Sequence, residues 1–416
     1  MLDPKLFHGI VVIIDDQLRG AVENIHAIQK QIETVGCHVI GMTTLPTDAQ
    51  LANLGGASFF IVDWNLVGEP FDEGIAIPDA LKARLVAEVI AFLKKLKGVR
   101  IAPVFVFTNE PTNVVIEELR KHPDLFIDAD PSHILVKSKA EVVEKGIFAV
   151  LLEWLQQAPS AYVLKRWELE YERAKNDLFM DFYGRSVYWP LILKQTFEKD
   201  DVPPSVALGN LIGRNLLSRM TPFEFELESF DEKLLLGIQA NDEKYRETLL
   251  SVLEGERFLS AERLHETSVA PGDVFKEGKS YYINIRPECD CIARKGQNQD
   301  DVNLYLLKGS KLSSGQLNFQ EGYGQLEERD VNTAIFAMKD GSSFSFQFSE
   351  LQVRPWRDLK DKRIGRLLSP FLTRLQQRYA SYLQRPGLPR IPVAAVAAVP
   401  AKTIEPVPPN GPKEGP

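Results

Sequence analysis

Two apolar runs near the N-terminus of this sequence end on carboxylates. Residues 9–16 read GIVVIIDD and close with Asp15 and Asp16, and residues 58–63 read SFFIVD and close with Asp63. A continuous apolar run is typical of a strand buried on both faces, so an acid at its end needs a separate explanation. Clustered carboxylates repel one another, and a hard divalent cation such as Mg²⁺ relieves that repulsion. The three acids are therefore candidate ligands of Mg²⁺.

Two later apolar runs end on groups that suit phosphoryl transfer. PVFVFT (103–108) ends on Thr108, and HILVK (133–137) ends on Lys137. A hydroxyl can donate a hydrogen bond to one phosphoryl oxygen, and an ammonium can pair with another. With a cation beside it, Asp63 would act as the nucleophile toward an incoming phosphoryl group. A second explanation stays open, because Asp at a strand end often caps the next turn and Lys137 could simply pair with it.

The apolar runs alternate with helical patterns, which indicates how these side chains are positioned. The runs are residues 9–16, 38–42, 58–63, 103–108 and 133–137. Apolar residues at helical spacing follow in 17–35, 79–97, 112–121 and 140–157. Strands this apolar, separated by helices, predict an α/β domain with a five-stranded parallel sheet covered on both faces. Ligands bind outside the carboxyl ends of such strands, so the polar residues that end them would meet at one edge.

This constellation resembles the receiver domain of two-component response regulators over about residues 9–157. The resemblance implies a flavodoxin-like, doubly wound sheet. In that family the acidic pair after the first strand holds Mg²⁺, and the acid after the third strand accepts the phosphoryl group. A Thr or Ser after the fourth strand and a Lys after the fifth respond to phosphorylation. The resemblance assigns these roles, in that order, to Asp15 and Asp16, Asp63, Thr108, and Lys137, and it makes the backbone carbonyl of Asn65 a further ligand of Mg²⁺.

The sequence departs from the receiver pattern in three places. Ser138 follows Lys137 where receivers usually have Pro, and Ile134 lies near the position of their usual aromatic residue. An insert, GEPFDEGIAIP (68–78), lengthens the segment after the third strand. These departures leave an alternative open. It is a degenerate receiver that acts as a non-enzymatic interaction scaffold in a multi-protein system such as phage defence.

Beyond a receiver-like domain at 1–157, the sequence predicts three further regions. Residues 158–262 hold no comparable strands and predict a helical region. Residues 263–385 carry short β patterns and a final helix, and their start loosely resembles SH3-like barrels. Within them, NTAIFAM and SFSFQF flank KDGS (339–342), which indicates a hairpin. Residues 386–416 are rich in Pro and Ala and predict a disordered tail.

The motif PECDCIAR (287–294) places two thiols, Cys289 and Cys291, around an acid. No further Cys follows, and His265 is the only nearby His, so the ligand set of a zinc site is incomplete. A recognisable base for a nucleophilic thiol is also missing. We therefore interpret this stretch as a buried turn inside a small barrel.

Two other stretches have weaker signals. GNLIGRN (209–215) lacks the lysine and hydroxyl of a phosphate-binding loop, so we expect its glycines to serve tight helix packing. The stretch 354–390 is locally basic and is either a solvated face or a surface for an acidic partner or nucleic acid. No helix-turn-helix pattern stands out, which makes a DNA-binding regulator the less favoured alternative.

Composition places the chain among ordinary globular proteins, with 44% hydrophobic and 25% charged residues and a net charge of −8. That charge gives no global attraction to nucleic acid or to an anionic membrane. Three cysteines fit a reducing compartment, and neither a secretory signal nor an apolar run of about 18 residues is found. We expect a cytoplasmic protein with no catalysis beyond its own phosphorylation. Its expected partners are a histidine kinase or phosphotransfer protein, and a protein bound by the C-terminal region.

Overall fold

The computed structural model divides the chain into two compact units, residues 1–246 and 247–416. The structure describes residues 3–20, 23–66, 79–99, 103–126, 134–220, 224–266, 268–294, 296–313, 317–320, 323–326 and 328–385. The insert at 68–78 and the tail at 386–416, both singled out in the sequence, lie outside the described residues. Each unit is described by itself below.

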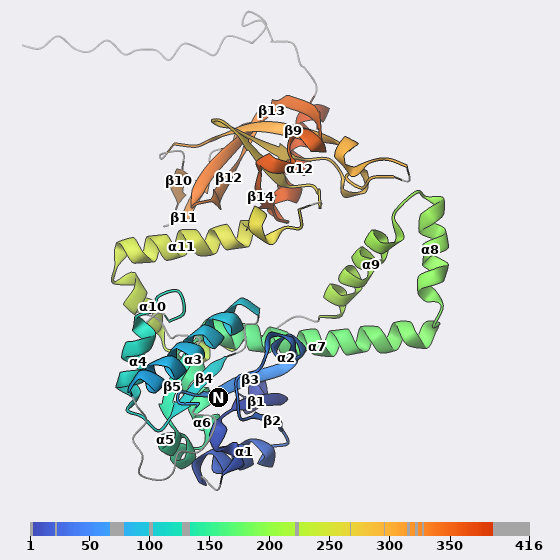
Figure 1. The fold of residues 1–416 in the computed structure, drawn as a ribbon. Coiled ribbons are helices and arrows are strands. Elements are labelled where there is room, and N and C mark those ends of the chain that lie inside the picture. The colour runs from blue at the N-terminus through green and yellow to red at the C-terminus, as the bar shows by residue number, and fades with distance from the viewer. Residues whose placement is uncertain are drawn as a thin grey trace, which may run out of the picture. The chain divides into compact units, whose positions relative to one another are not determined.

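A five-stranded parallel sheet forms the centre of the first unit (Figure 1). Its strands are β1 (Ile10–Ile14), β2 (His38–Met42), β3 (Ala57–Asp63), β4 (Val104–Thr108) and β5 (Ile134–Ser138). Their order is β2-β1-β3-β4-β5, the doubly wound order of flavodoxin-like folds. All residues of β3 are buried, as expected for a central strand covered on both faces. The predicted fold class of this region is confirmed.

Six helices cover the two faces of this sheet. They are α1 (Glu23–Thr34), α2 (Asp48–Asn53), α3 (Asp79–Val99), α4 (Thr112–Arg120), α5 (Lys139–Lys145) and α6 (Ile147–Gln156). Successive strand residues point to opposite faces, so β1 contributes Val12 to one core and Val11 to the other. Residues of α2, α3 and α4 fill the first core, and residues of α1, α5 and α6 fill the second. Two short 3-10 helices, η1 (Pro4–Phe7) and η2 (Asp16–Arg19), flank β1.

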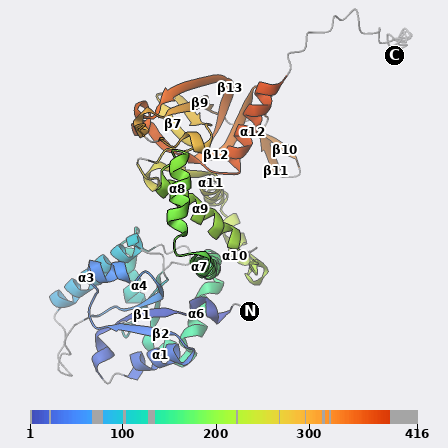
Figure 2. The ribbon, with the colours of Figure 1, turned by 90° about the vertical axis from the view of Figure 1, so that its right-hand side faces the viewer.

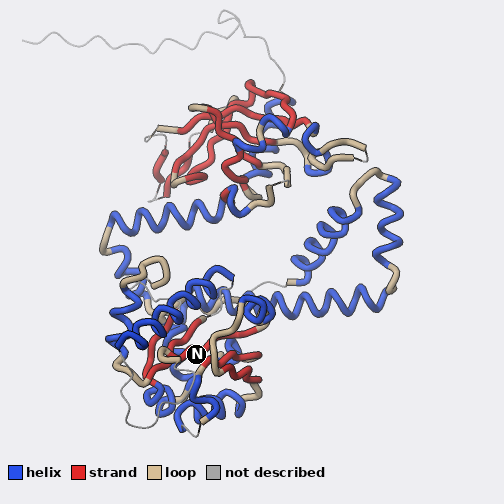
Figure 3. The backbone as a smooth tube through the Cα atoms, in the orientation of Figure 1, coloured by secondary structure: helices blue, strands red, loops and turns tan. Residues whose placement is uncertain are grey.

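The first unit continues as helices, which confirms the helical middle of the chain. These are α7 (Pro159–Arg185), α8 (Trp189–Lys199), α9 (Pro204–Arg219) and α10 (Glu232–Gln239), with a 3-10 turn, η3 (Leu227–Ser229), before α10. The described residues between α7 and α10 contain no strand (Figure 3). The first turns of α7 belong to the core of the sheet domain, because Tyr162 is buried there. One turn later, the buried Lys165 donates from Nζ to the backbone oxygen of Ser58 at 3.1 Å. A further helix, α11 (Asp242–Arg257), crosses the division between the units.

The second unit is a nearly closed antiparallel barrel of seven strands in the order β12-β13-β9-β8-β7-β14-β6. The strands are β6 (Phe258–Ser260), β7 (Asp273–Glu277), β8 (Ser280–Asn284), β9 (Asn303–Lys311), β12 (Asn332–Lys339), β13 (Ser342–Pro355) and β14 (Arg363–Leu367). A separate hairpin joins β10 (Leu317–Gln320) to β11 (Tyr323–Leu326). Helix α12 (Phe371–Gln384) packs beside the barrel and gives Leu372 and Leu375 to its core (Figure 2).

The predicted hairpin at 339–342 is present in the barrel. Lys339 pairs with Ser342, and the two residues between them, Asp340 and Gly341, have φ angles of 50° and 61°. Such a two-residue turn needs left-handed conformations at both central positions, which Asp and Gly tolerate better than most residues. Short 3-10 turns complete the unit at η4 (Ala261–Arg263), η5 (Glu288–Asp290), η6 (Gln299–Asp301), η7 (Trp356–Asp358) and η8 (Lys360–Lys362). Among the described residues, no helix has both the length and the apolar character needed to cross a membrane.

Candidate metal centre at the carboxyl edge of the parallel sheet

The three predicted acids meet at the carboxyl edge of the parallel sheet. Asp15 follows β1, Asp16 begins η2 and Asp63 is the last residue of β3. Ile14 pairs with Val62 in the register of β1 and β3, so the residues that follow them lie side by side. One ligand oxygen from each acid lies within 4.8 Å of the other two. This convergence of Asp15, Asp16 and Asp63 confirms what the strand ends predicted.

The carboxylate of Asp15 has two roles. Its Oδ1 accepts a hydrogen bond from the backbone nitrogen of Gln17 at 2.9 Å and so caps η2. Its Oδ2 is buried, faces the ammonium of Lys139 at 2.7 Å, and has no partner with hydrogen-bond alignment. The capping role proposed for an acid at a strand end is therefore real for one oxygen, and it leaves the other directed into the site.

The ammonium of the site belongs to Lys139, the first residue of α5. Its side chain is fully buried, and Nζ donates to Asp63 Oδ2 at 3.0 Å and to Gln17 Oε1 at 3.1 Å. The same Nζ is the ion-pair partner of Asp15. A single ammonium thus bridges the two buried acids, whereas the lysine that the sequence assigned to the site was Lys137.

Lys137, the lysine expected from the sequence, lies elsewhere. Its side chain is partly exposed, and Nζ donates to Glu141 Oε1 at 2.8 Å. The strand continues through Ser138, so period-two alternation places Lys137 on the same face of the sheet as Leu135. The ammonium that contacts Asp63 follows one residue after the strand ends.

The remaining predicted residues lie near the same edge. Thr108 is the last residue of β4 and is buried, and its Oγ1 accepts a hydrogen bond from the backbone nitrogen of Glu110 at 2.9 Å. Its neighbour Phe107 pairs with Asp63, so Thr108 is one residue beyond that acid on the adjacent strand. Asn65 is half-buried, two residues after Asp63. The role of its carbonyl as a ligand stays a prediction.

Burial makes the negative charge of this site costly. The pKa of Asp63 is raised to about 7, mainly by burial. The Lys139 ammonium lowers this pKa, and the negative charge of Asp15 raises it. Burial also raises the pKa of Asp15. Two buried carboxylates that share one ammonium carry more negative charge than the ammonium can balance.

The donor set fits a hard divalent cation such as Mg²⁺. All three candidate ligands are carboxylates, which are the oxygen donors that Mg²⁺ prefers. The Oδ2 of Asp15 faces the site without an aligned hydrogen bond, and an ion bound there would share it with the Lys139 ammonium at 2.7 Å. Asp15, Asp16 and Asp63 would therefore hold the ion, with Lys139 beside it.

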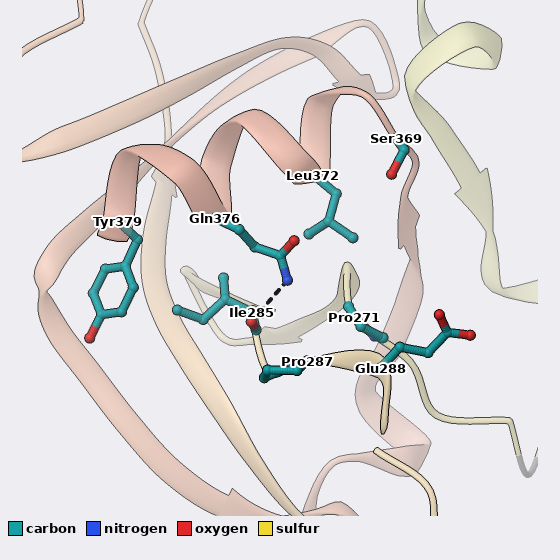
Figure 4. A pocket seen from close by; sticks show the side chains of 8 residues that line it. All are labelled: Pro271, Ile285, Pro287, Glu288, Ser369, Leu372, Gln376 and Tyr379. Carbon is teal, nitrogen blue, oxygen red and sulfur yellow. Dashed lines mark hydrogen bonds between the residues drawn. The ribbon is translucent and has the colours of Figure 1, made fainter. Parts of the chain in front are cut away.

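A hollow in the second unit offers little comparable chemistry. It has a volume of about 500 Å³ and lies between α12 and the turn after β8 (Figure 4). Its lining is mostly apolar, and Gln376 Nε2 closes one side by donating to the backbone oxygen of Ile285 at 3.0 Å. The carboxylate of Glu288 is the charged group at its edge. A single carboxylate beside apolar side chains does not indicate a particular reaction in this hollow.

The cysteine motif is not the buried turn that the sequence predicted, because residues 287–289 are exposed and Cys291 is its buried residue. Cys291 is buried, and burial raises the pKa of its thiol to about 11, which keeps it protonated at neutral pH. Cys289 is exposed, and neither cysteine forms a disulfide. Nearby, the buried Asp273 pairs with Arg366 Nε at 2.6 Å. This ion pair was not predicted, because its partners are far apart in the sequence.

Comparisons of the chain with protein-family models, with curated proteins and with solved structures found no match. The geometry at the edge of the sheet is therefore the basis for inferring a function.

Proposed function

We propose that the first unit is a receiver-like signalling module in which Asp63 accepts a phosphoryl group and Asp15, Asp16 and Asp63 hold Mg²⁺. The observation that supports it is the convergence of three carboxylates and the ammonium of Lys139 at the carboxyl edge of a β2-β1-β3-β4-β5 sheet. The donor would be a histidine kinase or a phosphotransfer protein. The second unit would carry the output through a protein partner.

In the proposed phosphoryl transfer, Asp63, Lys139 and Thr108 have different roles. An ionised oxygen of Asp63 forms the new O–P bond while the N–P bond of a phosphohistidine breaks and the imidazole leaves. Mg²⁺, when bound, neutralises charge on the transferred group. Lys139 Nζ is placed to pair with a phosphoryl oxygen because it already lies 3.0 Å from Asp63 Oδ2. The hydroxyl of Thr108, at the end of the adjacent strand, would donate to another oxygen.

A second candidate function is a degenerate receiver that binds a partner without being phosphorylated. The observation that favours it is the burial of the charged groups. Lys139 is fully buried between Asp15 and Asp63, which are 0% and 4% exposed, and the pair can act as a structural link between β1, β3 and α5. A closed ion-pair network of this kind resists entry of a phosphodonor.

Phosphorylation of the intact chain separates these candidates. With Mg²⁺ and acetyl phosphate, the protein should gain one phosphoryl group by intact mass, and peptide mapping should place it on Asp63. Asp63→Asn should abolish the gain, whereas Asp124→Asn, at an exposed acid paired with Lys94, should leave it unchanged. A wild-type chain that stays unmodified with acetyl phosphate and with candidate histidine kinases would favour the scaffold.

A further inference from the structure

The end of α7 together with α8 and α9, residues 174–219, forms an arm that carries many exposed apolar side chains. Neither α8 nor α9 contains a single buried residue. Eight large apolar side chains of the arm are 56–73% exposed. They are Phe179, Met180, Tyr183, Val187, Tyr188, Leu191, Ile192 and Leu217.

Helices of this kind need a partner to be stable. Isolated helices shorter than about 12–15 residues are marginal in water, and most helical stability in proteins comes from packing an apolar face. Helix α8 has 11 residues and α9 has 16, and α9 contacts both α7 and α8. A helix with apolar residues around much of its circumference is typically buried in an assembly.

The charges of the arm are largely satisfied within it. Arg219 pairs with Asp177 at 2.6 Å and also with Asp181, which in turn pairs with Arg185 at 2.9 Å. Between residues 174 and 219 the sequence has six basic and five acidic residues. A nearly neutral surface with internal ion pairs neither selects a charged partner nor repels a copy of itself.

Helix α9 also has a row of small and apolar residues on one face, exposed at three of its four positions and half-buried at Gly213. Val206, Gly209, Gly213 and Leu217 follow one another at helical spacing. A Cβ atom added at Gly209 or Gly213 would meet no described atom within 4 Å. The tight helix packing predicted for these glycines is therefore not made by the described part of this chain, and their surface is open to another helix.

We propose that this arm is a dimerisation surface that packs against the same arm of a second copy. The area agrees with what a stable dimer needs. The three aromatic side chains among the eight have areas of about 150–250 Å² each and the five others are somewhat smaller, so at 56–73% exposure the eight present on the order of 800 Å² in total. A specific interface buries about 800 Å² per partner. The arm therefore supplies enough apolar surface without help from the rest of the chain.

Sedimentation velocity of the full chain tests this proposal. Between about 1 and 100 µM, the wild type should reach twice the chain mass of 46.9 kDa. The double variant Leu191→Asp, Leu217→Asp should weaken association by at least about 100-fold, because charges would enter the apolar interface. Both side chains are exposed in the single chain, so its fold should be retained.

The matched control is Val353→Asp with Leu383→Asp, two similarly exposed residues of the second unit, which should leave the dimer intact. Amide exchange of residues 189–219 in the wild type, which needs no substitution, should slow as concentration rises. A wild type that is monomeric at 100 µM would overturn the proposal and assign the arm to another protein or to the chain's own second unit. A dimer that survives the arm variant would overturn it as well.

Discussion

At the scale of single residues, the two lysines at the end of β5 allow a direct test of the site. Lys139→Met would leave the buried Asp15 and Asp63 without their ammonium, and breaking a buried pair from one side costs about 3–5 kcal/mol. Lys137→Met would break only a partly exposed pair with Glu141, which contributes less than about 1 kcal/mol. Amide exchange of peptides covering β1 and β3 in the intact chain should show this difference in the free energy of opening.

Adding Mg²⁺ to the same exchange experiment tests whether the acids bind the ion. If the acids bind the ion, Mg²⁺ should slow exchange of β1 and β3 more strongly in Lys139→Met than in the wild type, because the ion replaces the lost positive charge. Equal effects of the two lysine substitutions would contradict the placement of Lys139 between the acids.

The acids could be predicted from the sequence, and the lysine could not, for a physical reason. Each acid directly ends an unambiguous apolar run, so its place at the edge of a parallel sheet follows from the strand itself. The fifth run ends less clearly, because β5 extends through Lys137 and Ser138. The strand ends one residue later than predicted, and the ammonium that enters the site comes from the residue after that end, two positions beyond Lys137. One feature of the sequence could have indicated the correct lysine: Lys139 directly follows Ser138, a residue type that often caps the start of a helix.

At the scale of elements, the strands with strong local patterns were predictable and the strands that close the barrel were not. The short β patterns predicted in residues 263–385, NTAIFAM and SFSFQF among them, correspond to β7, β8, β9, β12 and β13. Two strands were not predicted: β6, which has three residues, and β14, which contains the charged residues Arg363 and Arg366. Their pairing depends on contacts between residues about 100 positions apart, and no local periodicity encodes it.

Glu277 links separate elements of the barrel. From the end of β7 it accepts two hydrogen bonds from Arg354 of β13, at 2.6 and 2.9 Å, and one from Lys362 of η8 at 2.6 Å. These cations lower the pKa of Glu277 from 4.5 to about 2. A depressed carboxyl pKa gives stability that is present above pH 4.5 and is lost as the pH falls toward 2.

We therefore expect Glu277→Gln to lower the free energy of unfolding of the second unit on the order of 1–2 kcal/mol at pH 7, after allowance for solvent screening. The difference from the wild type should shrink as the pH falls below 4.5. Amide exchange of β7 and β13 at pH 3, 5 and 7, corrected for intrinsic rates, measures it. Glu350→Gln, which breaks a more exposed pair with Lys308, is the control and should cost less than about 1 kcal/mol. A pH-independent effect of Glu277→Gln would contradict the ion-pair explanation.

At the scale of the whole molecule, α7 ties the sheet domain to the helical region. Tyr162 is buried in the core beside Phe230, at a ring distance of 5.3 Å, and its hydroxyl accepts a hydrogen bond from the backbone nitrogen of Glu226 at 3.1 Å. Lys165 reaches the backbone of Ser58 near the start of β3, the strand that ends on Asp63. The sequence placed a domain boundary at 157 because the strand pattern stops there. These contacts cross that boundary.

The contacts of α7 predict different stabilities for two fragments. Residues 1–157 contain the complete sheet and its helices and are expected to fold alone, but they lack Tyr162 and Lys165. Residues 1–246, the whole first unit, should have a free energy of unfolding in urea that is about 3–5 kcal/mol larger than that of residues 1–157. This is the usual cost of deleting a large buried aromatic side chain. In the longer fragment, Tyr162→Ala should remove most of that difference. Leu164→Ala, at a residue of the same helix that is 52% exposed, should change stability by less than about 0.5 kcal/mol. Equal urea midpoints and slopes for the two fragments would show that α7 is an independent element and that the core of the sheet domain is complete without it.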